Sequence, residues 1–151
     1  MEKPDICNVE KMKYEPLNNK DMKKLLGLIT ALYFGLASLN AMSYEEARDR
    51  ARFLTDKMAY ELNLNDQQYN DAYEINLDYL MNIRTASDAS SVYLEYRNAD
   101  LRFILYDWQY ALFQAATYFF RPVIWRTSGW FLPVYTIYSP SRFYYSPPRV
   151  Y

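Results

Sequence analysis

The sequence contains no histidine and a single cysteine, Cys7, in 151 residues. One cysteine cannot form a disulfide within the chain, and a metal site built from cysteine and histidine needs more ligands than the chain offers. General acid-base and nucleophilic catalysis lose their commonest side chains for the same reason. We therefore expect a protein that is not an enzyme, with no catalytic residues, no bound metal and no cofactor.

Glycine and proline are missing between Leu36 and Phe120. These residues interrupt helices most strongly, so their absence favours helices joined by Asn, Asp and Ser turns. The length suits one domain with a modest core. The predicted fold class is all-α, with an antiparallel helical hairpin, a long third helix and an aromatic C-terminal tail.

Residues 22–41 have the form of a secretory signal peptide. Two lysines precede an apolar run from Leu25 to Leu36, and small residues lead to Ala41. A basic start, an apolar stretch of about 7–15 residues and a small-residue cleavage site are typical of such peptides. We expect cleavage near Ala41 and a periplasmic or secreted location; an uncleaved anchor or a buried helix is the alternative. The polar residues 1–21 then precede a true start at Met22.

A corner between two helices is predicted around Asn65. Residues 43–62 repeat apolar side chains at intervals of three and four, which predicts a helix capped by Ser43. The next helix begins after Asn65, an N-cap whose partner Gln68 completes a capping box, and runs to about Arg84. With so short a turn between them, the two helices should form an antiparallel hairpin within a helical domain over residues 42–120.

A third helix is predicted over Val92–Phe120, where Pro122 ends it. Whether residues 88–120 form one helix or two is left open by the sequence. Its apolar residues are spaced 4,3,4,3, which is typical of a seam packed lengthwise against partners. Such a helix would be about 44 Å long, so the tail or a second copy of the chain must help to cover it. The seam consists of Val92, Tyr96, Ala99, Phe103, Tyr106, Tyr110, Phe113, Thr117 and Phe120. A second apolar row, which widens the apolar side so that both rows need cover, consists of Leu94, Leu101, Leu105, Trp108, Leu112 and Phe119.

The tail, residues 121–151, differs sharply in composition from the helical region. It contains nine aromatic residues, five prolines, four arginines and no acidic residue, whereas residues 42–120 carry a net charge of −6. Segments 123–125 and 130–138 are predicted to pair as a β-hairpin, followed by an extended ribbon. The tail either packs along the acidic helices or is presented outward to a partner. The candidate partner-binding residues are Trp125, Arg126, Trp130, Tyr135 and Arg142.

The turn residues Leu64, Asn65 and Gln68 carry a resemblance to a known family. Their L-N-x-x-Q pattern resembles the signature of the LTXXQ-motif family, the Spy/CpxP-like helical-hairpin proteins of the periplasm, with asparagine replacing threonine as the cap. Residues 105–110 echo residues 64–69 at four of six positions, but we interpret this second copy as interior to the third helix. The resemblance implies a helical-hairpin fold and a chaperone or stress-adaptor role.

Two other groups of side chains could suggest chemistry. Asp71, Glu74 and Asp78 share one helical face, which could hold a hard cation but is more often a solvated surface. The tyrosines could suggest a carbohydrate-binding face, although their helical spacing is better explained by core packing. These tyrosines are Tyr69, Tyr73, Tyr79, Tyr93, Tyr96, Tyr106 and Tyr110.

Two functional classes follow from these observations. The first is an exported holdase or envelope stress adaptor that binds unfolded proteins or an envelope protein. The second is a structural or assembly subunit that binds a partner or a second copy of itself through the third helix and the tail. Contact with a membrane surface fits the aromatic tail, and the net charge of −1 argues against nucleic acid as a partner.

Overall fold

The computed structural model describes residues 18–24, 41–127 and 129–151. The chain divides into two compact units, residues 1–36 and 37–151. In the first unit residues 19–24 are helical. Most of the predicted signal peptide, including its apolar run, lies outside the described residues.

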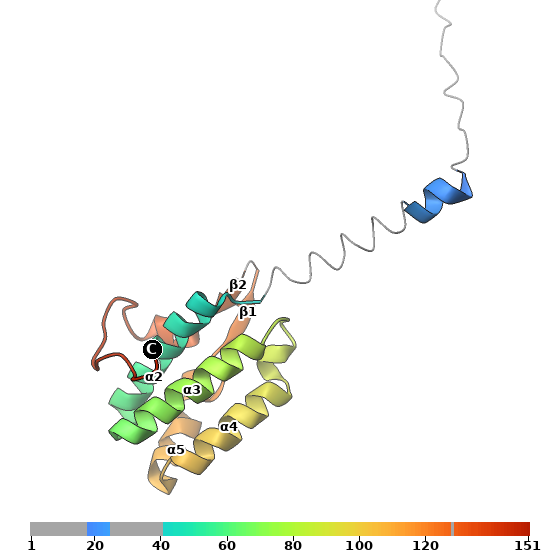
Figure 1. The fold of residues 1–151 in the computed structure, drawn as a ribbon. Coiled ribbons are helices and arrows are strands. Elements are labelled where there is room, and N and C mark those ends of the chain that lie inside the picture. The colour runs from blue at the N-terminus through green and yellow to red at the C-terminus, as the bar shows by residue number, and fades with distance from the viewer. Residues whose placement is uncertain (1–17, 25–40, 128) are drawn as a thin grey trace, which may run out of the picture. The chain divides into compact units, whose positions relative to one another are not determined.

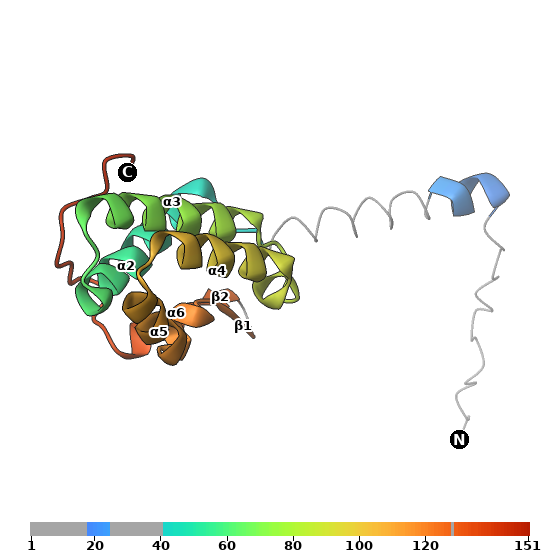
Figure 2. The same ribbon diagram turned by 90° about the horizontal axis from the view of Figure 1, so that it is seen from below.

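The second unit is built from α-helices, so the predicted all-α class is confirmed (Figure 1). Helices α2 (Tyr44–Leu62) and α3 (Asp66–Asn82) form the predicted antiparallel hairpin. A 3-10 turn, η2 (Asp88–Ser90), leads into α4 (Val92–Ile104), which packs along α3. Helices α5 (Asp107–Ala115) and α6 (Thr117–Phe120) follow, and Figure 2 shows them beneath the α2–α4 layer.

The two predicted helix starts of the hairpin are present. Ser43 caps α2 by accepting the backbone N–H of Glu46 at 3.2 Å. At the start of α3, Asn65 accepts the N–H of Gln68 at 2.9 Å, and the Gln68 side chain accepts the N–H of Asn65 at 3.1 Å. This reciprocal capping box satisfies two donors that a helix start leaves without partners. Asn63, in the left-handed conformation, lets the chain turn between the helices.

The single third helix predicted over Val92–Phe120 is wrong. The chain leaves the helical conformation at Leu105 and Tyr106 and again at Ala116. An unbroken helix would extend beyond the hairpin, whereas the break returns α5 to α2, which it contacts. The 4,3,4,3 spacing did not reveal the break because each short helix is amphipathic in its own right.

The predicted β-hairpin is present but shorter than expected. Strands β1 (Ile124–Arg126) and β2 (Gly129–Phe131) pair antiparallel, with Trp125 opposite Trp130. The second strand does not continue to residue 138, because Pro133 starts a 3-10 turn, η3 (Pro133–Thr136). Proline cannot donate to a strand ladder, and its fixed φ suits the first position of a helical turn.

A buried cation connects four helices within the core. The Arg97 guanidinium on α4 donates to Asn76 Oδ1 of α3 at 2.8 Å and to the Phe119 carbonyl at the end of α6 at 3.0 Å. Its Nη2 also lies 3.9 Å from the sulfur of Met58 on α2. Burial lowers the pKa of Arg97 to about 9. No carboxylate pairs with it among the residues that the structure describes, so neutral acceptors alone satisfy this cation.

Candidate functional site

The two motif glutamines, Gln68 and Gln109, meet in the interior. Gln68 Nε2 lies 2.7 Å from Gln109 Oε1, and Gln109 Nε2 lies 3.1 Å from Gln68 Oε1. Gln68 Nε2 also donates to the carbonyl of Ile104 at the end of α4, at 2.9 Å. Gln109 Nε2 donates to the carbonyl of Leu62 at the end of α2, at 3.0 Å. The Gln68 side chain therefore caps the C-terminal end of α4, and the Gln109 side chain caps the C-terminal end of α2.

The second motif copy is a helix start and not the helix interior that the sequence predicted. Tyr106 is the N-cap of α5, and its backbone N–H donates to the Gln109 side chain at 2.9 Å. The tyrosine side chain does not supply the cap; the backbone and the glutamine do. The signal that could have revealed this helix start was the echo itself, since Leu105 and Gln109 are buried as Leu64 and Gln68 are.

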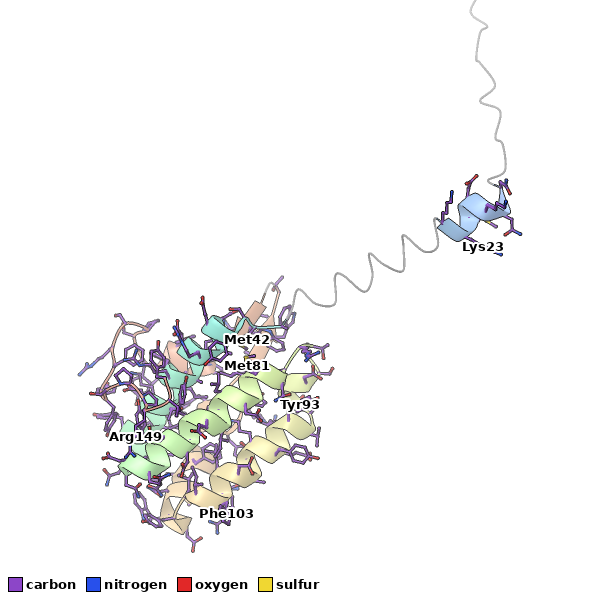
Figure 3. The ribbon with its side chains drawn as sticks, in the orientation of Figure 1. Lys23, Met42, Met81, Tyr93, Phe103 and Arg149 are labelled. Atoms are coloured by element: carbon purple, nitrogen blue, oxygen red, sulfur yellow. The ribbon has the colours of Figure 1, made fainter. Side chains whose placement is uncertain are left out.

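The outer face of α4 is apolar and exposed. On its inner side Leu94 and Leu101 are buried. Phe103 lies on the opposite side of a helix with about 3.6 residues per turn, and its side chain is 90 % exposed. Figure 3 labels Phe103 and Tyr93 at the two ends of this helix. The seam predicted to be buried thus faces solvent along α4, and the second apolar row packs inward.

The exposed row continues around the corner into α5. Tyr106 and Trp108 are more than half exposed, while Phe113 on the inner side of α5 is fully buried. Clusters of apolar side chains this exposed are unusual on the surface of a monomeric protein, and such clusters mark interaction sites. We call this set the α4–α5 aromatic surface. It consists of Val92, Tyr96, Phe103, Tyr106, Trp108 and Leu112.

A groove of about 500 Å³ lies between α4 and the α5–α6 segment. Its apolar lining includes Leu94, Ala99, Tyr110 and Phe120. A second groove of about 300 Å³ shares Arg121 with it and extends along β1. The concave, mostly apolar surface beside an exposed aromatic row is the form that a protein-binding site takes.

The tyrosines divide between core and surface. Tyr69, Tyr73 and Tyr79 on α3 are buried, as core packing predicted. Burial raises the pKa of Tyr69 and of Tyr79 to about 12. Tyr110 on α5 is partly buried and packs against the core. The core interpretation is wrong for Tyr93 and Tyr96 on α4 and for Tyr106 before α5, which are exposed.

Acidic side chains of the predicted stripe on α3 interact with neighbouring amides. Asp71 accepts a hydrogen bond from Gln67 at 2.7 Å, and Asp78 accepts one from Asn82 at 3.2 Å. Glu74 is exposed. Within residues 18–24, 41–127 and 129–151, no three metal-ligating side chains gather in one place.

Three of the five candidate partner-binding residues contribute to the fold. Trp125 and Trp130 pack edge to face with ring centroids 4.8 Å apart, and the Trp130 carbonyl accepts a hydrogen bond from Arg50. The ring centroids of Tyr135 and of Phe53 on α2 lie 4.7 Å apart, and burial raises the pKa of Tyr135.

The two candidate arginines remain exposed, although each contacts a ring of the tail. The guanidinium of Arg126 lies over Phe131, and that of Arg142 lies over Tyr144. The tail beyond η3 packs on α2 and α3, so of the two accounts given for the tail the structure has the packed one.

Comparison with known proteins gives one match. Residues 40–101 match the model of a family described as a domain of unknown function, DUF4890. The match includes α2, α3 and most of α4 but stops before Gln109, and it spans less than half of the chain. No curated protein and no solved structure matches the chain.

Proposed function

We propose that this chain is a non-enzymatic protein-binding protein of the Spy/CpxP-like kind, acting as a holdase or stress adaptor in the bacterial envelope. The observation that carries the proposal is the outer face of α4, where Phe103 is 90 % exposed on the side opposite the buried Leu94 and Leu101. Exposing an aromatic side chain to this extent has no use in packing the monomer. Its use is in contact with another polypeptide.

The arrangement of the corners supports the relation to the LTXXQ-motif family. Two L-x-x-x-Q segments start helices and pair through Gln68 and Gln109. Export is the second part of the proposal and derives from the signal-peptide form of residues 22–41. Of the helices in the described parts of the chain, none has the length and apolar character of a membrane span.

The binding function is tested by aggregation of an unfolded client without ATP. We expect the purified protein to slow aggregation, and a Phe103→Ser, Trp108→Ser double variant to lose most of this protection. Tyr44→Ser is the matched control, since Tyr44 is 54 % exposed on α2 and Trp108 is 51 % exposed on α5. Equal protection by both variants, or none by the unmodified protein at several-fold molar excess, would refute the holdase.

Export is tested separately. A bacterial cell expressing the full sequence is fractionated, and the N-terminus of the protein is determined. We expect a periplasmic or secreted product that begins near Met42. A product that stays in the cytoplasm with residues 22–41 attached would contradict the export proposal and leave the binding proposal standing.

A second candidate is an assembly subunit that buries the same surface against another chain. The spacing of Val92, Tyr96, Ala99 and Phe103 on one exposed face favours it, because 4,3,4 spacing is that of helix-to-helix seams. This candidate predicts a stable oligomer or a co-purifying partner, which Phe103→Ser would disrupt. Sedimentation as a monomer at micromolar concentration would count against it.

A further inference from the structure

The last thirteen residues, Ser139–Tyr151, lie against α2 and α3 as a segment without helix or strand, with turns at residues 140–141 and 149–150 and a bend at 144–145. Figure 3 labels Arg149 beside the N-terminal half of α3. Most of these residues are exposed, and only Pro148 is buried. We call this segment the strap and the surface beneath it the strap groove. The groove residues that contact the strap include Arg52, Asp56, Lys57, Tyr60, Tyr69 and Asn70.

A fully buried ion pair forms the centre of the groove. The side chains of Asp56 and Lys57 have no exposed surface, and Lys57 Nζ lies 2.7 Å from Asp56 Oδ2. The Asp56 carboxylate accepts the backbone N–H of Tyr144 at 3.0 Å and that of Tyr145 at 2.8 Å. Lys57 donates to the backbone carbonyl of Arg142. The pair thus recognises three main-chain groups of the strap.

Further along α3 the recognition is again of the main chain. The hydroxyl of Tyr69 donates to the carbonyl of Ser146 at 3.0 Å, and the side-chain oxygen of Asn70 accepts the N–H of Arg149 at 2.8 Å. Side chains of the groove therefore bind backbone atoms at five positions of the strap. Backbone groups are common to all sequences, so this kind of recognition tolerates other segments.

Aromatic contacts add a preference for residue type. The ring of Tyr60 on α2 stacks on Tyr144 with centroids 4.1 Å apart and planes 9° from parallel. The guanidinium of Arg52 lies 4.2 Å from the centre of the Phe143 ring. Lys57 lies within 4.6 Å of the Tyr144 ring centre. Rings are thus held by stacking and by cations, which suits aromatic segments.

The strap does not fill its groove as core residues fill a core. An open space of about 290 Å³ lies between the strap and α3, and its lining residues are Asp66, Tyr69, Asn70, Tyr145, Ser146, Pro147 and Arg149. The strap is therefore held by polar contacts at fixed points, with open space beside them.

Charge favours the same class of segment. Residues 42–120 carry a net charge of −6, and the strap contributes Arg142 and Arg149 with no acidic residue. Opposite net charges speed association and disfavour acidic competitors. Lys57 is the single lysine after residue 41. It binds the strap and is not part of the α4–α5 aromatic surface.

We propose that the strap groove is a binding site for an aromatic and basic segment of a partner protein that has no regular secondary structure, and that Ser139–Tyr151 is its intramolecular occupant. A tethered segment competes at an effective concentration on the order of millimolar. The groove is thus closed in the resting protein and opens when the partner segment displaces the strap. This site is distinct from the α4–α5 aromatic surface, and it can fail or stand independently of the proposed function.

The test uses the full chain with a protease site inserted between Ser139 and Pro140, where the chain is exposed. The protein is cleaved after folding, and circular dichroism checks that the helices persist. A fluorescent peptide with the sequence of residues 139–151 is then titrated, and binding is followed by anisotropy. We expect binding to the cleaved protein and at least about tenfold weaker binding to the uncleaved one.

Backbone recognition is tested with the peptide itself. N-methylation at Tyr144 and Tyr145 removes the two N–H groups that Asp56 accepts and changes no side chain. We expect at least about a tenfold loss of affinity, because both hydrogen bonds are made to a charged group. N-methylation at Val150 is the matched control, because the Val150 N–H donates to no acceptor among the described residues. It should change affinity by less than about threefold.

Three results of these experiments would overturn the proposal, and a fourth, from a shuffled peptide, would do so as well. The helices unfold on cleavage, which makes the strap part of the core; the freed peptide does not bind; or the two N-methylated peptides bind alike. A fourth arm uses a peptide with the same residues in a shuffled order. Affinity within about tenfold of the natural order supports a partner segment, whereas binding of the natural order alone assigns the groove to the strap of a second copy and overturns the partner.

Discussion

The α2–α3 side and the α4–α5 side of the helical unit present similar residues but are covered differently. On the α2–α3 side, aromatic residues of the tail lie over the helices, with Tyr144 stacked on Tyr60 and Phe143 against Phe53. On the α4–α5 side, Phe103 and Trp108 are exposed. An amphipathic pattern therefore indicates which face of a helix can be buried. Whether that face is buried depends on whether another segment of the chain packs against it.

The largest expected contrast is between two phenylalanines of equal size. Phe113→Ala should lower the free energy of unfolding by about 3–5 kcal/mol, because its side chain is fully buried and leaves a cavity. Phe103→Ala should change it by less than about 0.5 kcal/mol, because its side chain is already in water. Urea unfolding of both variants measures the difference. A large loss for Phe103→Ala would mean that the α4 face is buried in solution.

The next effect concerns the covered side. Asp56→Asn removes the charge opposite the buried Lys57 and should cost about 3 kcal/mol, since a buried ion pair that loses one partner leaves an uncompensated charge. The exposed Asp49, which accepts a hydrogen bond from the Tyr151 hydroxyl at 2.7 Å, provides the control. Asp49→Asn should cost less than about 1 kcal/mol. Equal losses in thermal unfolding would contradict a central role for Asp56.

The two sides are joined at the glutamine pair, and Gln68→Ala tests that joint. The substitution removes the side chain that hydrogen-bonds to the Asn65 N–H, the Ile104 carbonyl and the Gln109 amide. We expect the free energy of unfolding to fall by about 2–3 kcal/mol. Gln67→Ala, one residue earlier and exposed, should cost less than about 0.5 kcal/mol. Chemical denaturation compares the two. Similar losses would show that the pair adds nothing specific.

The smallest effect is a change in tyrosine titration at Glu61, which accepts hydrogen bonds from Tyr118 and Tyr138. Burial, and then the hydrogen bond to Glu61, raise the pKa of Tyr118 to about 12 from an ordinary value of 10.0. The stabilisation from the protonated hydroxyl is full below pH 10 and is lost as the pH rises through 12.

Glu61→Gln should lower the pKa of Tyr118 toward, but not to, its ordinary value, because burial is the larger cause. Stability between pH 10 and 12 should therefore fall less steeply in the variant than in the unmodified protein. Assigned tyrosine carbon shifts follow the titration. An unchanged Tyr118 pKa would exclude a contribution from Glu61.

Local signals in the sequence were enough to predict the hairpin. Ser43, Asn65 and Gln68 act through hydrogen bonds to groups within three residues, so their chemistry is visible without the fold. The antiparallel β-hairpin around Gly129 was predictable for the same reason. The break at Leu105 was missed because apolar spacing continues across it, and because the N-cap of α5 is Tyr106, a residue type that does not signal a helix start as Asn65 does.

The candidate surface was less predictable than the fold. Phe103 and Trp108 were assigned to apolar rows expected to be covered, and the structure exposes both. Trp130 and Tyr135 were candidates for a partner and contribute to the fold. The sequence shows how apolar a helix face is, but it does not show which other segment packs against that face.

The sequence by itself determined the helical class, the capped corner at Asn65 and the contrast between an acidic body and a basic aromatic tail, because caps, periodicity and charge act over a few residues. The tertiary structure alone decided that the helix breaks at Leu105, that the strap lies on α2 and α3, and that Phe103 remains in water. Burial is a property of pairs of distant segments, and a limited number of segments cannot cover every apolar face.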